Sequence, residues 1–238
     1  MVLSARILFR KSGNPYSPRF VERCVSQFGP SYNTVVLEII NRSRANLTRE
    51  VFLTNVALVM PNFLMTRQGP FHGLRYIREK DRITGKTRRV RQCWDIAGKE
   101  IRRLKKFIRS NKVHSYQRIL VDMASDDREE VALRLWKIFK MLLPICMGKS
   151  TLGLVAASKL LFSVFPEVAL PVDNTQWRAV FKTVDYSDII MHMAEEIAWW
   201  EKKTGRQLNF CVPDYLEAMT LPAIYNVMAM KARPRQPG

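Results

Sequence analysis

Apolar residues recur every three or four positions along most of this chain, a spacing that places them on one face of an α-helix. In residues 17–28 such a face is made of Phe20, Val21, Cys24, Val25 and Phe28. Pro18 stands at the first helical position, where its missing N–H costs little. Similar patterns predict helices over residues 46–61, 95–108, 125–144, 154–165, 174–184 and 187–203. The fold is therefore expected to be mainly α.

Two stretches depart from this helical pattern. Residues 34–40, TVVLEII, form a short apolar run that is compatible with a strand. A small basic β-hairpin is expected to turn at Thr84–Gly85. The tail after Met230 is expected to fray. Because no repeat or low-complexity tract divides the sequence, residues 1–238 are predicted to form a single unit.

Composition limits the class of protein. The chain has 238 residues, of which 47% are apolar, so it is long enough to bury a sizeable core. No apolar run approaches the ~20 residues of a membrane span, and no secretory leader is evident. We therefore expect no membrane partner and a location in the cytoplasm, nucleoid or nucleus. The four cysteines lack the CxxC spacing of metal cages, so neither a metal nor a cofactor is expected.

Positive charge is concentrated in one part of the chain. The net charge is +18, and residues 67–118 contain 17 Lys and Arg against four acidic residues, a balance of +13. Such a density suits the phosphate backbone of duplex DNA, because each neutralised phosphate releases counterions. A basic solvated face, or a surface for anionic lipid or an acidic protein, is the alternative.

The tetrapeptide GKST at 148–151 is similar to part of a nucleotide-binding P-loop. A P-loop also requires a glycine five residues before the GKS glycine, and Leu143 stands there. The preceding segment has the periodicity of a helix, whereas a P-loop follows a strand. A helix, a short turn containing glycine and a second helix instead describe a helix–hairpin–helix element. Its turn offers backbone N–H groups to one DNA phosphate.

This segment resembles the helix–hairpin–helix DNA glycosylases related to endonuclease III. The stretch STLGLVAASKLLFSVFPEVALPVDNT aligns without a gap with the family's turn, apolar helix and V-D-T-H motif. Gly153 falls on the second glycine of the turn, and VDNT at 172–175 falls on V-D-T-H. The resemblance implies a two-lobed helical glycosylase-like fold, with this element at about 128–184. Ser150 and Thr151 replace the family's proline and first glycine.

The resemblance also implies a catalytic role for Asp173. In the family, an aspartate at this position stabilises the positive charge that develops on the deoxyribose as the base leaves. A fixed carboxylate suits such an oxocarbenium-like state. A plain helix N-cap is the structural alternative for Asp173. Val155 occupies the position of the lysine with which bifunctional members cut the strand, so no lyase activity is expected.

The favoured hypothesis is a monofunctional DNA glycosylase that releases a modified or mismatched base. Two alternatives remain, a non-catalytic DNA-binding module with the same fold and an enzyme of modified-nucleotide base–sugar chemistry. The candidate DNA-binding residues near the turn are Lys149, Ser150, Thr151, Gly153 and Lys159. Those in the basic stretch are Arg88, Arg89, Arg91, Arg102, Arg103, Lys105 and Lys106.

Overall fold

The computed structural model of the protein is mainly helical, as the sequence pattern predicts. It describes residues 6–10, 13–28, 30–43, 46–67, 69–111, 115–148, 153–216 and 219–234. Its elements are α1 (Pro18–Phe28), α2 (Pro30–Ser43), α3 (Arg49–Asn62), β1 (Arg75–Ile77), β2 (Arg82–Thr84), α4 (Arg88–Ser110), α5 (Ile119–Asp122), α6 (Ser125–Cys146), α7 (Leu154–Phe162), the π-helix η3 (Gln176–Phe181), α8 (Tyr186–Thr204) and α9 (Leu221–Lys231). Short 3₁₀ turns lie between some of them.

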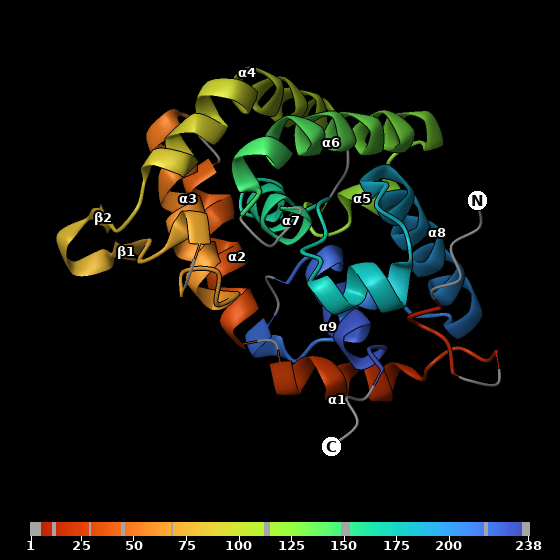
Figure 1. The fold of residues 1–238 in the computed structure, drawn as a ribbon. Coiled ribbons are helices and arrows are strands. Elements are labelled where there is room, and N and C mark those ends of the chain that lie inside the picture. Colours follow the sequence, from red (N-terminus) through yellow and green to blue (C-terminus); the bar gives the residue numbers. More distant parts are fainter. Residues whose placement is uncertain are drawn as a thin grey trace.

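The two long helices α4 and α6 pack side by side and form one end of the molecule (Figure 1). α6 also packs against α7 and α8, so it joins α4 to the other helices. Its buried residues include Leu135, Phe139 and Leu142, which follow one another at helical spacing. α1 lies at the opposite end of the molecule from α4 and packs against α9.

The prediction of a strand at residues 34–40 is wrong, because these residues belong to α2. Val35, Val36 and Ile39 are buried, whereas Leu37 is 42% exposed. This pattern has the period of a helix with one apolar face, and that face packs against α3 and α1. A short apolar run does not reveal its period, so packing against neighbouring helices decides its conformation.

The β-hairpin is present, but its turn is not where the sequence predicts. β1 pairs antiparallel with β2, and the chain reverses in the 3₁₀ turn Arg78–Lys80 and at Asp81 rather than at Thr84–Gly85. Gly85 has a different task. Its φ is +82°, and a Cβ there would lie 2.1 Å from the carbonyl oxygen of Gly73. Only glycine therefore fits at position 85, where the two backbone segments at the base of the hairpin approach each other closely.

The predicted helices from residue 95 onward are found, with shifted ends. The 95–108 pattern is part of the longer α4, and α6 continues through Pro144 to Cys146. α7 ends at Phe162 rather than at 165. The segment predicted at 174–184 contains the π-helix η3, which begins directly after the Asp173 motif.

Candidate nucleic-acid interface and the Asp173 cluster

α4 has one buried face and one basic face. Its 23 residues span about 35 Å at the helical rise of 1.5 Å per residue. Val90, Ile101 and Leu104 belong to the buried face. The exposed cations are Arg88, Arg89, Arg91, Lys99, Arg102, Arg103, Lys106 and Arg109. Most of the basic candidates from the sequence therefore lie on one solvent-facing surface.

Several of these cations have no acidic partner. In the part of the chain that the structure describes, no carboxylate lies within ion-pair distance of Arg88, Arg89, Arg91, Lys99 or Lys106. The other three have contacts inside the protein. Arg103 pairs with Glu100 at 2.7 Å, the guanidinium of Arg102 lies 5.2 Å from the centroid of the Trp94 ring, and Arg109 donates to the carbonyl oxygen of Ser43. We define the five unpaired cations as the α4 stripe. Their charge is available to an external anion.

Lys105 corrects the sequence prediction. It is 7% exposed, and its Nζ lies 2.5 Å from Oε1 of Glu167 and 3.2 Å from the carbonyl oxygen of Val164. Its charge is therefore used inside the protein, where it ties α4 to the segment after α7. A buried cation with its own counter-ion is not placed to hold DNA.

Asp173 is the N-terminal cap of the helical segment that contains η3. Its Oδ1 accepts a hydrogen bond from the backbone N of Gln176 at 2.8 Å. The backbone N of Asp173 donates in return to Oε1 of Gln176 at 2.7 Å. This reciprocal arrangement is a capping box, with Asp and Gln three residues apart. Nε2 of Gln176 donates to Oδ1 of Asn226 on α9 at 3.0 Å, which fixes the box against that helix.

The second oxygen of Asp173 faces the C-terminal tail. Nη1 of Arg233 lies 2.9 Å from Oδ2 of Asp173, and the two side chains are 35% and 27% exposed. Nε of Arg233 also donates to the carbonyl oxygen of Met230 at 3.3 Å. This part of the tail is therefore held in place, contrary to the expectation that it frays. Both carboxylate oxygens of Asp173 have partners.

Lys159 is a buried amine close to this ion pair. It is 6% exposed, and its Nζ lies 4.8 Å from the centroid of the Phe63 ring. Among the residues that the structure describes, none accepts a hydrogen bond from it. Burial lowers the pKa of Lys159 to about 8, and the positive charge of Arg233 acts in the same direction. The negative charge of Asp173 opposes them. The sequence predicts Lys159 as a phosphate contact, but its burial rules out a surface contact. Lys159 instead belongs to what we call the Asp173 cluster, defined as Lys159, Asp173 and Arg233.

The structure describes only part of the turn before α7. Lys149, Ser150 and Thr151 lie outside the described residues, so their candidate role is not placed. Gly153 has a φ of +76°, and a Cβ there would lie 2.8 Å from the backbone N of Met147 and 2.9 Å from the carbonyl carbon of Cys146. Glycine is thus required because α6 approaches closely. This packing against α6 gives the glycine a structural reason, and its contact with a DNA phosphate stays a prediction.

Sequence reasoning did not identify Gln176 and Arg233 as partners of Asp173. The Asp-x-x-Gln spacing of the capping box is readable in the sequence, and it favours the N-cap alternative for Asp173. Arg233 gave no local signal, because it meets Asp173 across 60 positions of the chain. Val155, which matches the family's lysine position, lies in the first turn of α7 and is partly buried.

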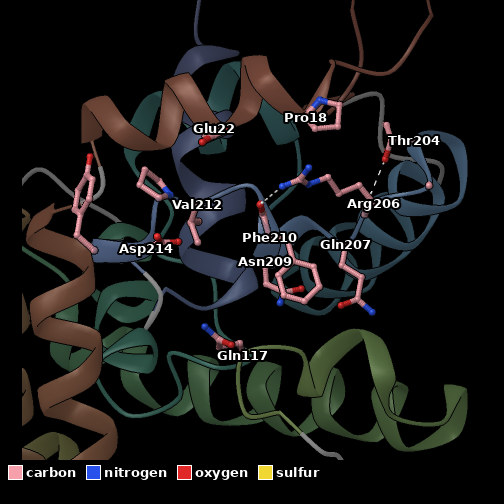
Figure 2. A pocket seen from close by; sticks show the side chains of 13 residues that line it. Pro18, Glu22, Gln117, Thr204, Arg206, Gln207, Asn209, Phe210, Val212 and Asp214 are labelled. Atoms are coloured by element: carbon pink, nitrogen blue, oxygen red, sulfur yellow. Dashed lines mark hydrogen bonds between the residues drawn. The ribbon is translucent and has the colours of Figure 1, made fainter.

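A cavity of about 1260 Å³ lies elsewhere, between α1, the end of α8 and the segment that follows it (Figure 2). Gln117, Gln207 and Asn209 contribute polar groups to its lining. Phe210 and Tyr215 also line it and are 60% and 62% exposed. None of its lining residues belongs to the Asp173 cluster. The cavity therefore does not serve Asp173 as a pocket for a base.

The described residues contain no group of three or more His, Cys, Asp and Glu side chains that could hold a metal ion. Nor does any helix among them have the length and apolar character needed to cross a bilayer. Comparison with protein-family models, with curated proteins and with solved structures finds no match for this chain.

Proposed function

We propose that the protein binds duplex DNA through the α4 stripe. The observation that supports this proposal is the set of five unpaired cations on one exposed face of a single helix. A helix of about 35 Å matches roughly one turn of duplex DNA. Each phosphate that the stripe neutralises releases counterions, which favours binding at low salt.

Charge reversal of the stripe tests this proposal. The variant replaces four stripe residues by Glu: Arg88, Arg91, Lys99 and Lys106. A matched control reverses four exposed cations on α1 and α8, with the same change in net charge: Arg19, Arg23, Lys202 and Lys203. Binding of a fluorescent duplex of roughly two helical turns is measured by anisotropy at several salt concentrations.

We expect the stripe variant to lose nearly all binding and the control to keep most of it. In a plot of log K against log salt, the slope of the wild type should exceed that of the stripe variant by about 3.6 in magnitude, the value for four phosphate contacts. Circular dichroism checks that both variants remain helical. Equal losses in the two variants would show that only the net charge matters, and the stripe would then not be the interface.

A second candidate function is release of a modified or mismatched base at Asp173. The observation that favours it is the Asp173 cluster, in which a carboxylate lies close to a buried amine with a lowered pKa. Ionisable groups with perturbed pKa values are more frequent at functional sites than elsewhere. The cap and the ion pair of Asp173 favour the non-catalytic alternative, because both give the carboxylate a structural task.

Base release places a clear demand on this geometry. A carboxylate that stabilises an oxocarbenium-like sugar must present an oxygen to it. Oδ1 of Asp173 holds the cap, so Oδ2 is the oxygen left for this role, and Arg233 must give up its ion pair. Water then adds to the sugar carbon and the base departs with the bonding electrons and takes up a proton. Val155 supplies no amine for an imine, so the strand stays intact.

A further inference from the structure

The β-hairpin presents an apolar face to the body of the protein and a basic face to solvent. In the β1–β2 pairing, Tyr76 stands opposite Ile83, and both side chains pack against the hydrophobic core. Successive residues of a strand point to opposite faces. Arg75 and Arg82 are therefore on the other face, and both are exposed. Neither has an ion-pair partner among the residues that the structure describes.

Side chains of α2 hold the hairpin in a fixed position. Nη2 of Arg42 donates to the hydroxyl of Tyr76 at 2.9 Å, and the guanidinium of Arg42 lies 4.8 Å from the centroid of the Tyr76 ring. Arg78 in the turn pairs with Glu38 at 2.9 Å. The hydroxyl of Tyr76 also donates to Asp81. The acidic Asp81 and Glu38 thus have partners within the hairpin and α2, whereas Arg75 and Arg82 have no ion-pair partner in the described part of the chain.

The hairpin also continues the surface of α4. It projects from the body of the protein beside the first turns of α4 (Figure 1). β2 ends at Thr84, and α4 begins at Arg88. The base between them is fixed by the close approach of Gly85 to the backbone of Gly73, which leaves no room for a side chain at Gly85. A hydrogen bond from the backbone N of Lys86 to the carbonyl oxygen of His72 at 3.2 Å holds it as well. The hairpin is therefore held in a fixed position relative to the start of α4.

We propose that the β1–β2 hairpin is a rigid basic arm that contacts phosphates of the same DNA duplex beyond the start of α4. This inference rests on the proposed DNA binding and adds a second contact surface to it. Arg75 and Arg82 are the residues that touch phosphate. A linear polyanion fits an elongated surface made of an arm and a long helix. Because the arm is held by α2, it loses little conformational freedom on binding.

The experiment removes the arm's charge without removing the hairpin. Arg75 and Arg82 are both replaced by Glu in one variant and by Gln in a second. The matched control is Lys202→Glu with Lys203→Glu, which changes the net charge by the same amount as the Glu variant. The salt dependence of binding to a duplex of roughly two turns is measured for all four proteins. Circular dichroism and the thermal midpoint check that the fold is kept.

We expect the arm variants to bind DNA more weakly than the control and with a log–log salt slope that is smaller by about 1.8, the value for two lost phosphate contacts. The Gln variant should show the same change of slope with a smaller loss of affinity. A slope equal to that of the control would show that the arm does not touch DNA, while binding by α4 would stand. Absence of binding by the wild type would overturn the proposed function and the arm together.

Vesicles with anionic headgroups are the second probe. Vesicle binding that is as strong as DNA binding, and is lost in the same arm variants, would identify a lipid surface instead and would also overturn the proposal.

Discussion

Arg233 Nη1 lies 2.9 Å from Asp173 Oδ2, so an ion pair joins the segment after α9 to the N-terminal cap of the helical segment that contains η3. The other oxygen of the same carboxylate caps that segment. Asp173 therefore has two separable roles, one that needs only a hydrogen-bond acceptor and one that needs a negative charge. Substitutions that differ in these two properties distinguish them.

Asp173→Asn is expected to keep the cap, because Asn caps helices about as well as Asp, and to lose the ion pair. Its free energy of unfolding should fall by less than ~1 kcal/mol, since a partly exposed ion pair contributes little. Asp173→Ala removes the cap as well and should cost a further ~0.5–2 kcal/mol. Urea denaturation measures both. Arg233→Gln is the matched control for the ion pair and should cost as much as Asp173→Asn. A cost for Asp173→Asn equal to that for Asp173→Ala would contradict the role of the cap.

Lys159 makes the stability depend on pH in a defined window. Burial lowers its pKa from 10.5 to about 8 in the folded protein. Between these two values the unfolded chain binds more protons than the folded one, so stability rises as pH increases from about 8 to 10.5. Below pH 8 the buried charge destabilises the fold by an amount that does not change with pH. The full effect is on the order of 3 kcal/mol.

Lys159→Met should therefore stabilise the protein at pH 7, and this gain should shrink as pH rises toward 10. The measured quantity is the difference in the free energy of unfolding between variant and wild type, which cancels the titration of all other groups. Lys99→Met, on the exposed face of α4, serves as the control and should show a small difference at every pH. A gain that stays constant up to pH 10 would mean that the amine of Lys159 does not titrate in this window.

The buried Lys105–Glu167 pair predicts a strong coupling. Lys105→Met leaves the Glu167 carboxylate buried without its counter-ion, and we expect a loss of about 3–5 kcal/mol in the free energy of unfolding. Lys105→Met combined with Glu167→Leu removes both charges and should recover most of that loss. Arg103→Met, which breaks an exposed pair with Glu100, is the control and should cost less than ~1 kcal/mol. Chemical denaturation of the wild type, of Lys105→Met and Glu167→Leu alone, and of the double variant gives the coupling energy, and additive losses would disprove it.

The sequence predicts the elements of this fold better than it predicts their contacts. α6 could be predicted because its apolar residues keep one helical period over 22 residues. The helical period of α4 likewise predicts that Lys105 is buried, which a count of charges does not show. Lys105 lies four residues after Ile101 and three before Ile108, both buried, so the phase of α4 directs it inward. A count of cations identifies a basic segment but not the cations that already have internal partners.

The Asp173 cluster shows the opposite balance. The capping box at Asp173 lies within four consecutive residues and can be read from the sequence. The other two members of the cluster come from α7 and from the tail after α9, and only the packing of these elements brings Lys159 and Arg233 close to Asp173. Gly153 is intermediate, since the sequence indicates a glycine at a turn but not that α6 would fill the space beside it.

Gly153→Ala should consequently destabilise the fold rather than weaken DNA binding selectively. Its Cβ would meet the backbone at the end of α6, and alanine is strained at a φ of +76°. We expect a loss of more than ~1 kcal/mol in the free energy of unfolding. DNA affinity at a temperature where the variant is folded should stay close to that of the wild type. Gly205→Ala is the control, because Gly205 has a similar φ and no atom near its Cβ position. Equal stability of the two variants would remove the case for close packing at Gly153.

Base release is the remaining prediction, and Asp173→Asn is its decisive variant. If Asp173 stabilises an oxocarbenium-like sugar, the wild type should release a free base from at least one duplex in a panel of deaminated, oxidised and alkylated bases. The strand should stay intact until alkali is added, because Val155 forms no imine. Asp173→Asn should lose nearly all release, since an amide supplies no negative charge, and should bind DNA as well as the wild type.

Lys159 provides the critical check on that prediction. Its pKa of about 8 means that most of its amine is neutral at pH 9, which is the form that attacks an aldehyde. Borohydride is therefore added at pH 9 to trap any imine between the protein and the DNA. An adduct formed by the wild type but not by Lys159→Met would show that Lys159 is a nucleophile and would overturn the monofunctional hypothesis. Absence of release and of any adduct across the whole panel would assign Asp173 to its cap and ion pair, and the protein would then be a DNA-binding module without glycosylase chemistry.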